Sequence, residues 1–213
     1  TPKPSSAASD VYKRQLLPLR LYRMSKVAIF ISGEGSNASK MLRNFSERIG
    51  IEIALVYSSR PNETLKVLCE DLDVEFQYLP WNHLEQINLL QLCKKISIDW
   101  IVLAGFLKLI PAPFIAHFPN KIINIHPALL PKFGGKGMYG MHVHNAVIQE
   151  KELESGITIH YVNGVYDEGQ IIKQFRISIS DKETSETLSR KVRALEHEHF
   201  SDTVAQLIMS NKV

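Results

Sequence analysis

The fold is decided by the stretch Lys26-Val-Ala-Ile-Phe-Ile-Ser32, which runs directly into Gly33-Glu-Gly35-Ser36-Asn37. A continuous apolar run bounded by glycine is typical of a strand that is buried on both faces of a parallel sheet. A helical pattern with Met41, Leu42 and Phe45 follows the glycines. A strand, a glycine turn and the start of a helix together predict an anion site, because backbone N–H groups and the helix dipole converge there.

The rest of the chain repeats this alternation of short apolar runs and helical patterns. It predicts an α/β, Rossmann-like fold with a mostly parallel seven-stranded sheet, helices on both faces and an antiparallel C-terminal part. A long helix is expected from Thr184 to about Met209, because Leu188, Val192 and Leu195 share one face. The expected strands are residues 26–32, 51–57, 75–79, 100–104, 122–126, 156–162 and 171–179.

Composition favours one globular domain, which we place at residues 24–213. Residues 1–23 show no clear helical or strand periodicity of apolar residues and are expected to be a disordered upstream segment. Of the 213 residues 45% are hydrophobic and 22% charged, and a net charge of +3 gives no reason to expect nucleic acid. No apolar run approaches a membrane span, and Cys69 and Cys93 are expected to be buried thiols. These features predict a cytoplasmic protein.

A second informative stretch is Lys121-Ile-Ile-Asn124-Ile-His126-Pro127. Strand side chains alternate between faces, so Asn124 and His126 should point the same way at the end of this strand. In a parallel sheet, ligands bind beyond the carboxyl ends of the strands. Gly33, Gly105 and the pair Asn124/His126 all fall at such ends, so we expect them at one edge. The apolar segment 106–110, next to Gly105, is either a cap on the core or a wall for a flat ligand.

Other interpretations of the same residues remain open at this point. Gly33-x-Gly35-x-x-Ala38 matches a loose dinucleotide fingerprint, and Arg60 after the second strand could suit a 2′-phosphate, as in an NADP-linked oxidoreductase. The glycine turn could also bind nothing, or serve a nucleotide-binding module without catalysis. His142 and His144, which lie two apart just before an expected helix, could form a zinc pair, but no third ligand has the usual spacing, so no metal is expected.

Four ordered motifs resemble the phosphoribosylglycinamide formyltransferases, a folate-dependent formyltransferase family of purine biosynthesis. They are Ile31-Ser-Gly-Glu-Gly-Ser-Asn37, Leu103-Ala-Gly-Phe-Leu-Lys-Leu109, Asn124-Ile-His126-Pro127 with the following Ala-Leu-Leu-Pro131-Lys132, and Gly156 through Asp167-x-Gly169. The resemblance implies transfer of a formyl group from 10-formyltetrahydrofolate, the co-substrate, to the amine of N1-(5-phospho-D-ribosyl)glycinamide, called glycinamide ribonucleotide below. It implies small-molecule partners, no metal, and a monomer or homodimer.

The resemblance also implies roles for individual residues. Asn124, His126 and Asp167 are the expected catalytic residues: an amide and an imidazole donor for the oxyanion of a tetrahedral intermediate, and a carboxylate beside the imidazole. Gly35, Ser36 and Asn37 are expected to bind the phosphate of the ribonucleotide. Glu196, on the final helix, is expected to contact the rest of the same substrate. The folate is expected to lie against Leu107, Lys108, Leu109 and Ile110, with Asn124 in reach.

Two related groups and two departures qualify the resemblance. The tRNA formyltransferases and the formyltetrahydrofolate hydrolases share part of these motifs, but they usually carry a further domain that we do not expect here. The loop after Pro131 looks longer than in common members, so its role does not follow from the family. Trp81-Asn82-His83 stands where many members have an arginine that contacts folate.

Overall fold

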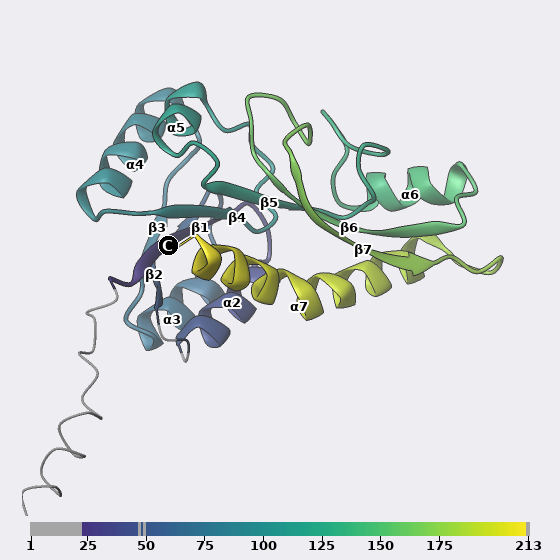
Figure 1. The fold of residues 1–213 in the computed structure, drawn as a ribbon, viewed down its shortest axis with the longest axis horizontal. Coiled ribbons are helices and arrows are strands. Elements are labelled where there is room, and N and C mark those ends of the chain that lie inside the picture. The colour runs from purple at the N-terminus through teal and green to yellow at the C-terminus, as the bar shows by residue number, and fades with distance from the viewer. Residues whose placement is uncertain (1–22, 47, 49, 212–213) are drawn as a thin grey trace, which may run out of the picture.

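The computed structural model describes residues 23–46, 48 and 50–211. Apart from Arg23, the segment 1–23 that we predict to be disordered lies outside the described residues. The described chain forms one sheet whose spatial strand order is β3-β2-β1-β4-β5-β6-β7 (Figure 1). These strands are β1 (Ser25–Ile31), β2 (Ile51–Ser58), β3 (Glu75–Tyr78), β4 (Trp100–Leu103), β5 (Ile122–His126), β6 (Glu154–Tyr161) and β7 (Ile171–Ser178).

The sheet is parallel from β3 to β5 and antiparallel from β5 to β7. The predicted α/β fold, with seven strands and an antiparallel C-terminal part, is therefore confirmed. Reversal of direction occurs where β6 pairs with β5, and Asn124 lies opposite His160 in that register. The helices are α2 (Ser36–Ser46), α3 (Glu63–Asp71), α4 (His83–Lys95), α5 (Ala112–His117), α6 (Met141–Gln149) and α7 (Ser185–Ser210).

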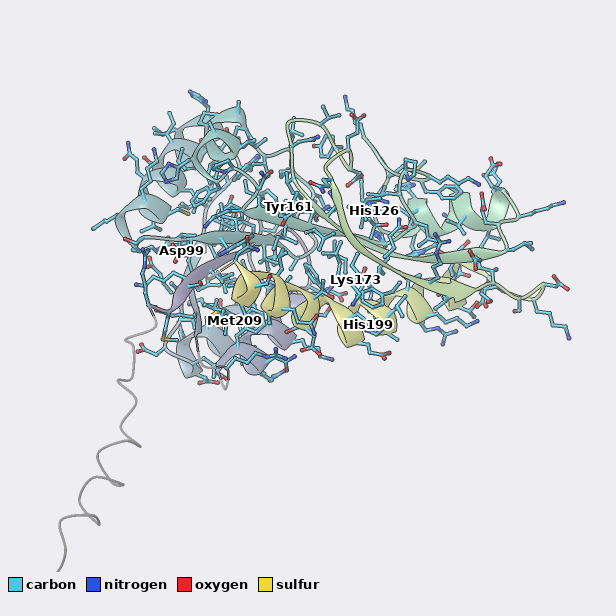
Figure 2. All side chains as sticks on the ribbon, viewed as in Figure 1. Asp99, His126, Tyr161, Lys173, His199 and Met209 are labelled. Atoms are coloured by element: carbon cyan, nitrogen blue, oxygen red, sulfur yellow. The ribbon has the colours of Figure 1, made fainter. Side chains whose placement is uncertain are left out.

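Helices cover both faces of the sheet because β1 is apolar on both sides. Its alternating residues enter two separate cores: Ile29 packs with α2, α3 and α7, and Phe30 packs with α4 and α5. Figure 1 shows α2, α3 and α7 on one side of the sheet and α4 and α5 on the other. A stack between the rings of Phe175 on β7 and His199 on α7, with centroids 3.8 Å apart, helps to hold the long helix across the sheet. Figure 2 shows His199 on this helix.

Local sequence signals set the helix starts. Asn62 and Asn82 each accept a hydrogen bond from the backbone N–H three residues later and so cap α3 and α4. Thr184 and Thr187 form a reciprocal capping box at the start of α7, where the long helix was expected to begin. In the part of the chain that the structure describes, no helix is both long and apolar enough to cross a membrane.

Candidate active site

A cavity of about 630 Å³ opens at the carboxyl ends of β1, β4 and β5. The glycine turn after β1, the segment after β4 and the end of β5 each contribute to its lining, as a parallel sheet predicts. All the site residues predicted from the sequence line this cavity: Gly35, Ser36, Asn37, Leu107, Lys108, Leu109, Ile110, Asn124, His126, Asp167 and Glu196.

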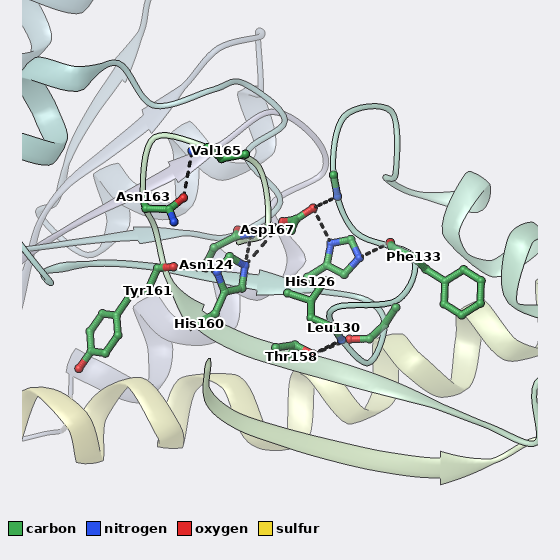
Figure 3. A network of polar contacts seen from close by, with 12 residues as sticks. Asn124, His126, Leu130, Phe133, Thr158, His160, Tyr161, Asn163, Val165 and Asp167 are labelled. Atoms are coloured by element: carbon green, nitrogen blue, oxygen red, sulfur yellow. Dashed lines mark hydrogen bonds and ion pairs between the residues drawn. The ribbon is translucent and has the colours of Figure 1, made fainter. Parts of the chain in front are cut away.

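His126 and Asp167 form the centre of the site (Figure 3). The Nδ1 atom of His126 lies 3.4 Å from Oδ2 of Asp167, and both side chains are largely buried. On the other side of the ring, Nε2 lies 2.7 Å from the carbonyl oxygen of Phe133. A carbonyl oxygen only accepts, so Nε2 carries a proton and donates it. The neutral ring therefore presents an unprotonated Nδ1 to Asp167.

Burial decides the charge of this pair. It lowers the pKa of His126, and the opposing effects of the Asp167 carboxylate and the Phe133 carbonyl do not offset it. Burial alone would raise the pKa of Asp167, but His160, His126 and the N–H of Gly135 together hold it below its usual value. At neutral pH the site therefore holds a carboxylate beside a neutral imidazole: Asp167 favours the imidazolium, as the family resemblance implies, but burial outweighs its effect.

Asn124 has a partner that sequence reasoning missed. Its Nδ2 atom lies 3.0 Å from Nε2 of His160 and 3.5 Å from Oδ1 of Asp167. The Nδ1 atom of His160 lies 2.8 Å from the carbonyl oxygen of Tyr161, which fixes a proton on Nδ1. In neutral His160, Nε2 then accepts from the Asn124 amide. Sequence reasoning had no signal for this contact, since His160 lies opposite Asn124 only through the antiparallel register of β5 and β6.

The glycine turn forms a separate wall of the cavity. Gly35 has φ +75°, and a Cβ there would lie 3.0 Å from Leu65 and 3.2 Å from Ile31, so both conformation and space favour glycine. Asn62, at the start of α3, donates from Nδ2 to the carbonyl oxygens of Gly33 (3.0 Å) and Glu34 (3.1 Å). These contacts hold the turn so that the start of α2 lines the cavity, and unpaired N–H groups at a helix start are suited to bind an anion.

A carboxylate from the last helix reaches the glycine turn. Nδ2 of Asn37 donates to Oε2 of Glu196 at 2.8 Å. Burial raises the pKa of Glu196, although Asn37 and Arg193 act in the opposite direction. Arg193 also lies 3.6 Å from Glu34. The cavity thus has cationic and anionic side chains next to the anion site at α2.

The segment after β4 gives the cavity an apolar wall. Ser32 fixes its start, because its Oγ accepts the N–H of Leu107 at 3.1 Å. Leu107 and Leu109 are about 40% exposed, whereas Ile110 is 3% exposed and packs in the core. Ile110 can therefore offer a ligand backbone groups but little side-chain surface. Behind the segment, Trp81 packs edge-on against Phe106, with the ring centroids 4.9 Å apart.

The alternative ligand predictions gain no support from the geometry. His142 is exposed and His144 is buried, and α6 begins at Met141, so both lie on the helix rather than before it. Among the described residues no group of three His, Cys, Asp or Glu side chains could hold a metal ion. Arg60, which could suit a 2′-phosphate in the dinucleotide interpretation, does not line the cavity.

Comparison with known proteins points to one family. Residues 25–204 match the model of the family described as formyl transferase. The chain is 35% identical over 195 residues to a chloroplastic phosphoribosylglycinamide formyltransferase of Arabidopsis thaliana, covering 87% of this chain and 66% of that protein. It is 32% identical to the phosphoribosylglycinamide formyltransferase of Bacillus subtilis, covering 88% of this chain and 97% of that protein.

Lengths differ more among the other relatives. The chain spans 61% of the chloroplastic protein of Vigna unguiculata and 14% of the trifunctional purine biosynthetic protein adenosine-3 of Drosophila melanogaster. Among solved structures, phosphoribosylglycinamide formyltransferase from Bacillus halodurans matches with a TM-score of 0.77 and 32% identity, covering 86% of this chain and 95% of that one. A formyltetrahydrofolate deformylase of Pseudomonas syringae shares the fold, with a TM-score of 0.79 at 20% identity.

Proposed function

The chain belongs to the formyl transferase family, and we propose that it transfers the formyl group of 10-formyltetrahydrofolate to the amine of glycinamide ribonucleotide, a step of purine biosynthesis. The observation that carries this proposal is the position of Asn124, His126 and Asp167 between an anion site and an apolar wall in one cavity. The printed names of the Arabidopsis and Bacillus relatives support the same reaction.

The two substrates would enter from different walls. We assign the phosphate of the ribonucleotide to the backbone of Gly35, Ser36 and Asn37, since a phosphate suits the positive end of α2. Glu196, fixed by Asn37, would bind the ribose hydroxyls as an acceptor. The flat pterin would lie against Leu107 and Leu109, and the backbone of Lys108 and Ile110 would supply its hydrogen bonds.

The reaction needs a proton acceptor and a fixed donor. The primary amine attacks the formyl carbon and gives a tetrahedral intermediate with a negative oxygen. The ionised Asp167 takes the proton that the amine loses, and Nδ1 of His126, 3.4 Å away, shares it. As the bond from the formyl carbon to N10 of the folate breaks, Asp167 and His126 return this proton to N10. The enzyme therefore gains or loses no proton over the whole reaction.

Asn124 would stabilise the oxyanion. One of its two N–H groups is fixed by His160 at 3.0 Å, and the other points toward Asp167 at 3.5 Å, the limit of a hydrogen bond. That second N–H is the one available to the formyl oxygen. His126 would act through its charge once Nδ1 is protonated, because its Nε2–H is already donated to Phe133.

A coupled absorbance assay tests the proposal. Purified protein is mixed with glycinamide ribonucleotide and a 10-formyl folate, and formation of tetrahydrofolate or the deformylated analogue is followed. We expect turnover that requires the ribonucleotide. Absence of turnover with folded protein would overturn the proposal, and folate deformylation without ribonucleotide would indicate a hydrolase. Binding of NADPH in a parallel titration would instead favour the oxidoreductase.

The remaining properties follow from this assignment. The partners would be the two small-molecule substrates, and the chemistry requires no metal, since fixed donors and a carboxylate supply the charge and the proton acceptor. Cytoplasmic location and the choice between monomer and homodimer stay predictions, and two plant relatives are named chloroplastic. Residues 24–213 would form the single catalytic domain.

A further inference from the structure

We propose that the backbone of residues 133–135 positions both catalytic side chains, and that Gly134 is a positioning residue for formyl transfer. This inference rests on the proposed function and assigns a role to the start of the long glycine-rich loop that follows Pro131. The loop lies between β5 and α6 and lines the cavity from Gly135 to Gly140.

Two hydrogen bonds from neighbouring loop residues reach the two members of the catalytic pair. The carbonyl oxygen of Phe133 accepts the Nε2–H of His126 at 2.7 Å. The backbone N–H of Gly135 donates to Oδ2 of Asp167 at 2.9 Å. The same Oδ2 atom lies 3.4 Å from Nδ1 of His126. The three loop residues and the two side chains therefore close a ring of contacts.

These contacts between the loop and the catalytic pair determine which atoms can carry a proton. Because Phe133 occupies Nε2–H, a proton that arrives at His126 can only bind Nδ1, next to Asp167. The N–H of Gly135 stabilises the charged form of Asp167 and is one cause of its lowered pKa. The loop thus fixes the tautomer of one catalytic group and the charge of the other.

Gly134 lies between the two loop residues that contact His126 and Asp167, at a position with no space for a side chain. A Cβ at this position would lie 2.5 Å from Cδ2 of Leu130 and 3.1 Å from Cβ of Asp167. Cδ2 is the flexible end of the Leu130 side chain and can shift, although that side chain is buried, whereas Cβ of Asp167 moves only with its backbone. An alanine at 134 would therefore push Asp167 away from the loop and lengthen the bond from Gly135.

The variant Gly134→Ala tests the proposal against Gly164→Ala, a control in the Asp167 loop where an added Cβ meets no atom within 4 Å. A misplacement of about 1 Å can cost about 10²-fold in rate, so a shift of a few tenths should lower kcat by roughly tenfold. KM for both substrates should stay within about twofold. The pKa of Asp167, followed by NMR of its carboxyl carbon, should rise in Gly134→Ala and stay unchanged in Gly164→Ala.

An independent measurement on the unchanged protein keeps the proposal testable if Gly134→Ala fails to fold. The ¹⁵N shifts of His126, assigned by their loss in His126→Gln, should report the Nε2–H tautomer. An Nδ1–H tautomer would overturn the proposal, as would a folded Gly134→Ala with wild-type kcat and an unchanged pKa of Asp167. A wild-type protein that transfers no formyl group would count against the proposed function alone, because the tautomer and the carboxyl pKa would still decide the role of the loop.

Discussion

Two glycine-rich segments line the same cavity, but they are held in different ways. The turn Gly33–Asn37 lies between β1 and α2, and Asn62 at the start of α3 binds two of its carbonyl oxygens. The segment Phe133–Gly140 joins β5 to α6, and among the described contacts its hydrogen bonds to side chains go to His126 and Asp167. The first segment is held by the residue that caps a neighbouring helix, and the second by the catalytic groups themselves.

This difference separates binding from chemistry. Changes on the side of the glycine turn should act on the affinity for the ribonucleotide and on stability, because Asn62 and Glu196 support the anion site there. Changes around Asp167 should act on kcat and on its pH dependence, because protons move on that side. The following predictions test this division, from the largest expected effect to the smallest.

Asp167→Asn should have the largest effect. It keeps the shape of the side chain but removes the proton acceptor, and such acid–base groups contribute about 10²- to 10⁴-fold in rate. Since the pKa of Asp167 lies below its usual value, the wild-type rate should fall only when the pH drops through that low pKa. In Asp167→Asn this acidic limb of the kcat–pH profile should disappear.

Asp181→Asn is the matched control for that profile. Asp181 is exposed in the turn before α7 and does not line the cavity. Its substitution should leave both the rate and the profile at wild-type values. A kcat–pH profile of Asp167→Asn that overlays the wild type would show that Asp167 only shapes its loop.

Asn124→Ala should lower kcat by about 10²–10³, or roughly 2.7–4 kcal/mol, the typical cost of losing one oxyanion donor. KM values should change less, because the donor acts mainly in the transition state. Asn145→Ala, on the exposed side of α6, is the control, since Asn145 does not line the cavity. Steady-state rates within a factor of about two of wild type for Asn124→Ala would remove the oxyanion role.

Glu196→Gln should raise KM for the ribonucleotide by roughly 10- to 100-fold, since hydrogen bonds to charged groups contribute about 1.5–3 kcal/mol. The uncharged amide should also stabilise the fold at neutral pH. Burial raises the pKa of Glu196 in the folded state above its value in the unfolded chain. As the pH rises from the unfolded pKa through the folded pKa, ionisation of Glu196 therefore lowers the free energy of unfolding of the wild type.

Thermal unfolding at two pH values checks this second effect. The difference in Tm between Glu196→Gln and wild type should be positive at neutral pH and vanish below the unfolded pKa of glutamate. Glu198→Gln, which changes an exposed carboxylate on the same helix, should alter neither KM nor Tm. A Glu196→Gln variant with wild-type KM would exclude Glu196 from the ribonucleotide site.

Asn62→Ala should have the smallest effect. It removes the cap of α3, which costs about 1 kcal/mol of stability, and it releases the glycine turn, so KM for the ribonucleotide should rise several-fold. Asn82→Ala removes the cap of α4 by the same change but touches no cavity residue. The two variants should lose similar stability, and only Asn62→Ala should show a higher KM. Equal KM values would mean that α2 alone fixes the turn.

Much of the fold was predictable because its signals are local. The apolar run of β1 and the start of α7 at Thr184 each depend on a few neighbouring positions, so the predicted strands and the long C-terminal helix agree with the observed ones to within two residues. The edge where the site lies was also predictable, because parallel strands share one carboxyl end.

Several parts of the site were not predictable in this way. His160 contacts Asn124 only through the antiparallel register of β5 and β6, which no short sequence pattern encodes. The charge state of His126 did not follow from the sequence either, because the sequence shows the neighbouring carboxylate but not the burial that outweighs it. The contacts of Phe133 and Gly135 are backbone hydrogen bonds, and their residue types carry no signal for them.

The sequence by itself determined the strands, the helices, the edge of the sheet where ligands bind and the identity of the residues placed there. Those properties follow from side-chain periodicity and from turn and cap chemistry, which operate over a few residues. Only the tertiary structure decided which ring nitrogen of His126 carries a proton, which N–H of Asn124 is available and why residue 134 has no side chain. These depend on distances of about 3 Å between segments far apart in the chain, and folding alone sets such distances.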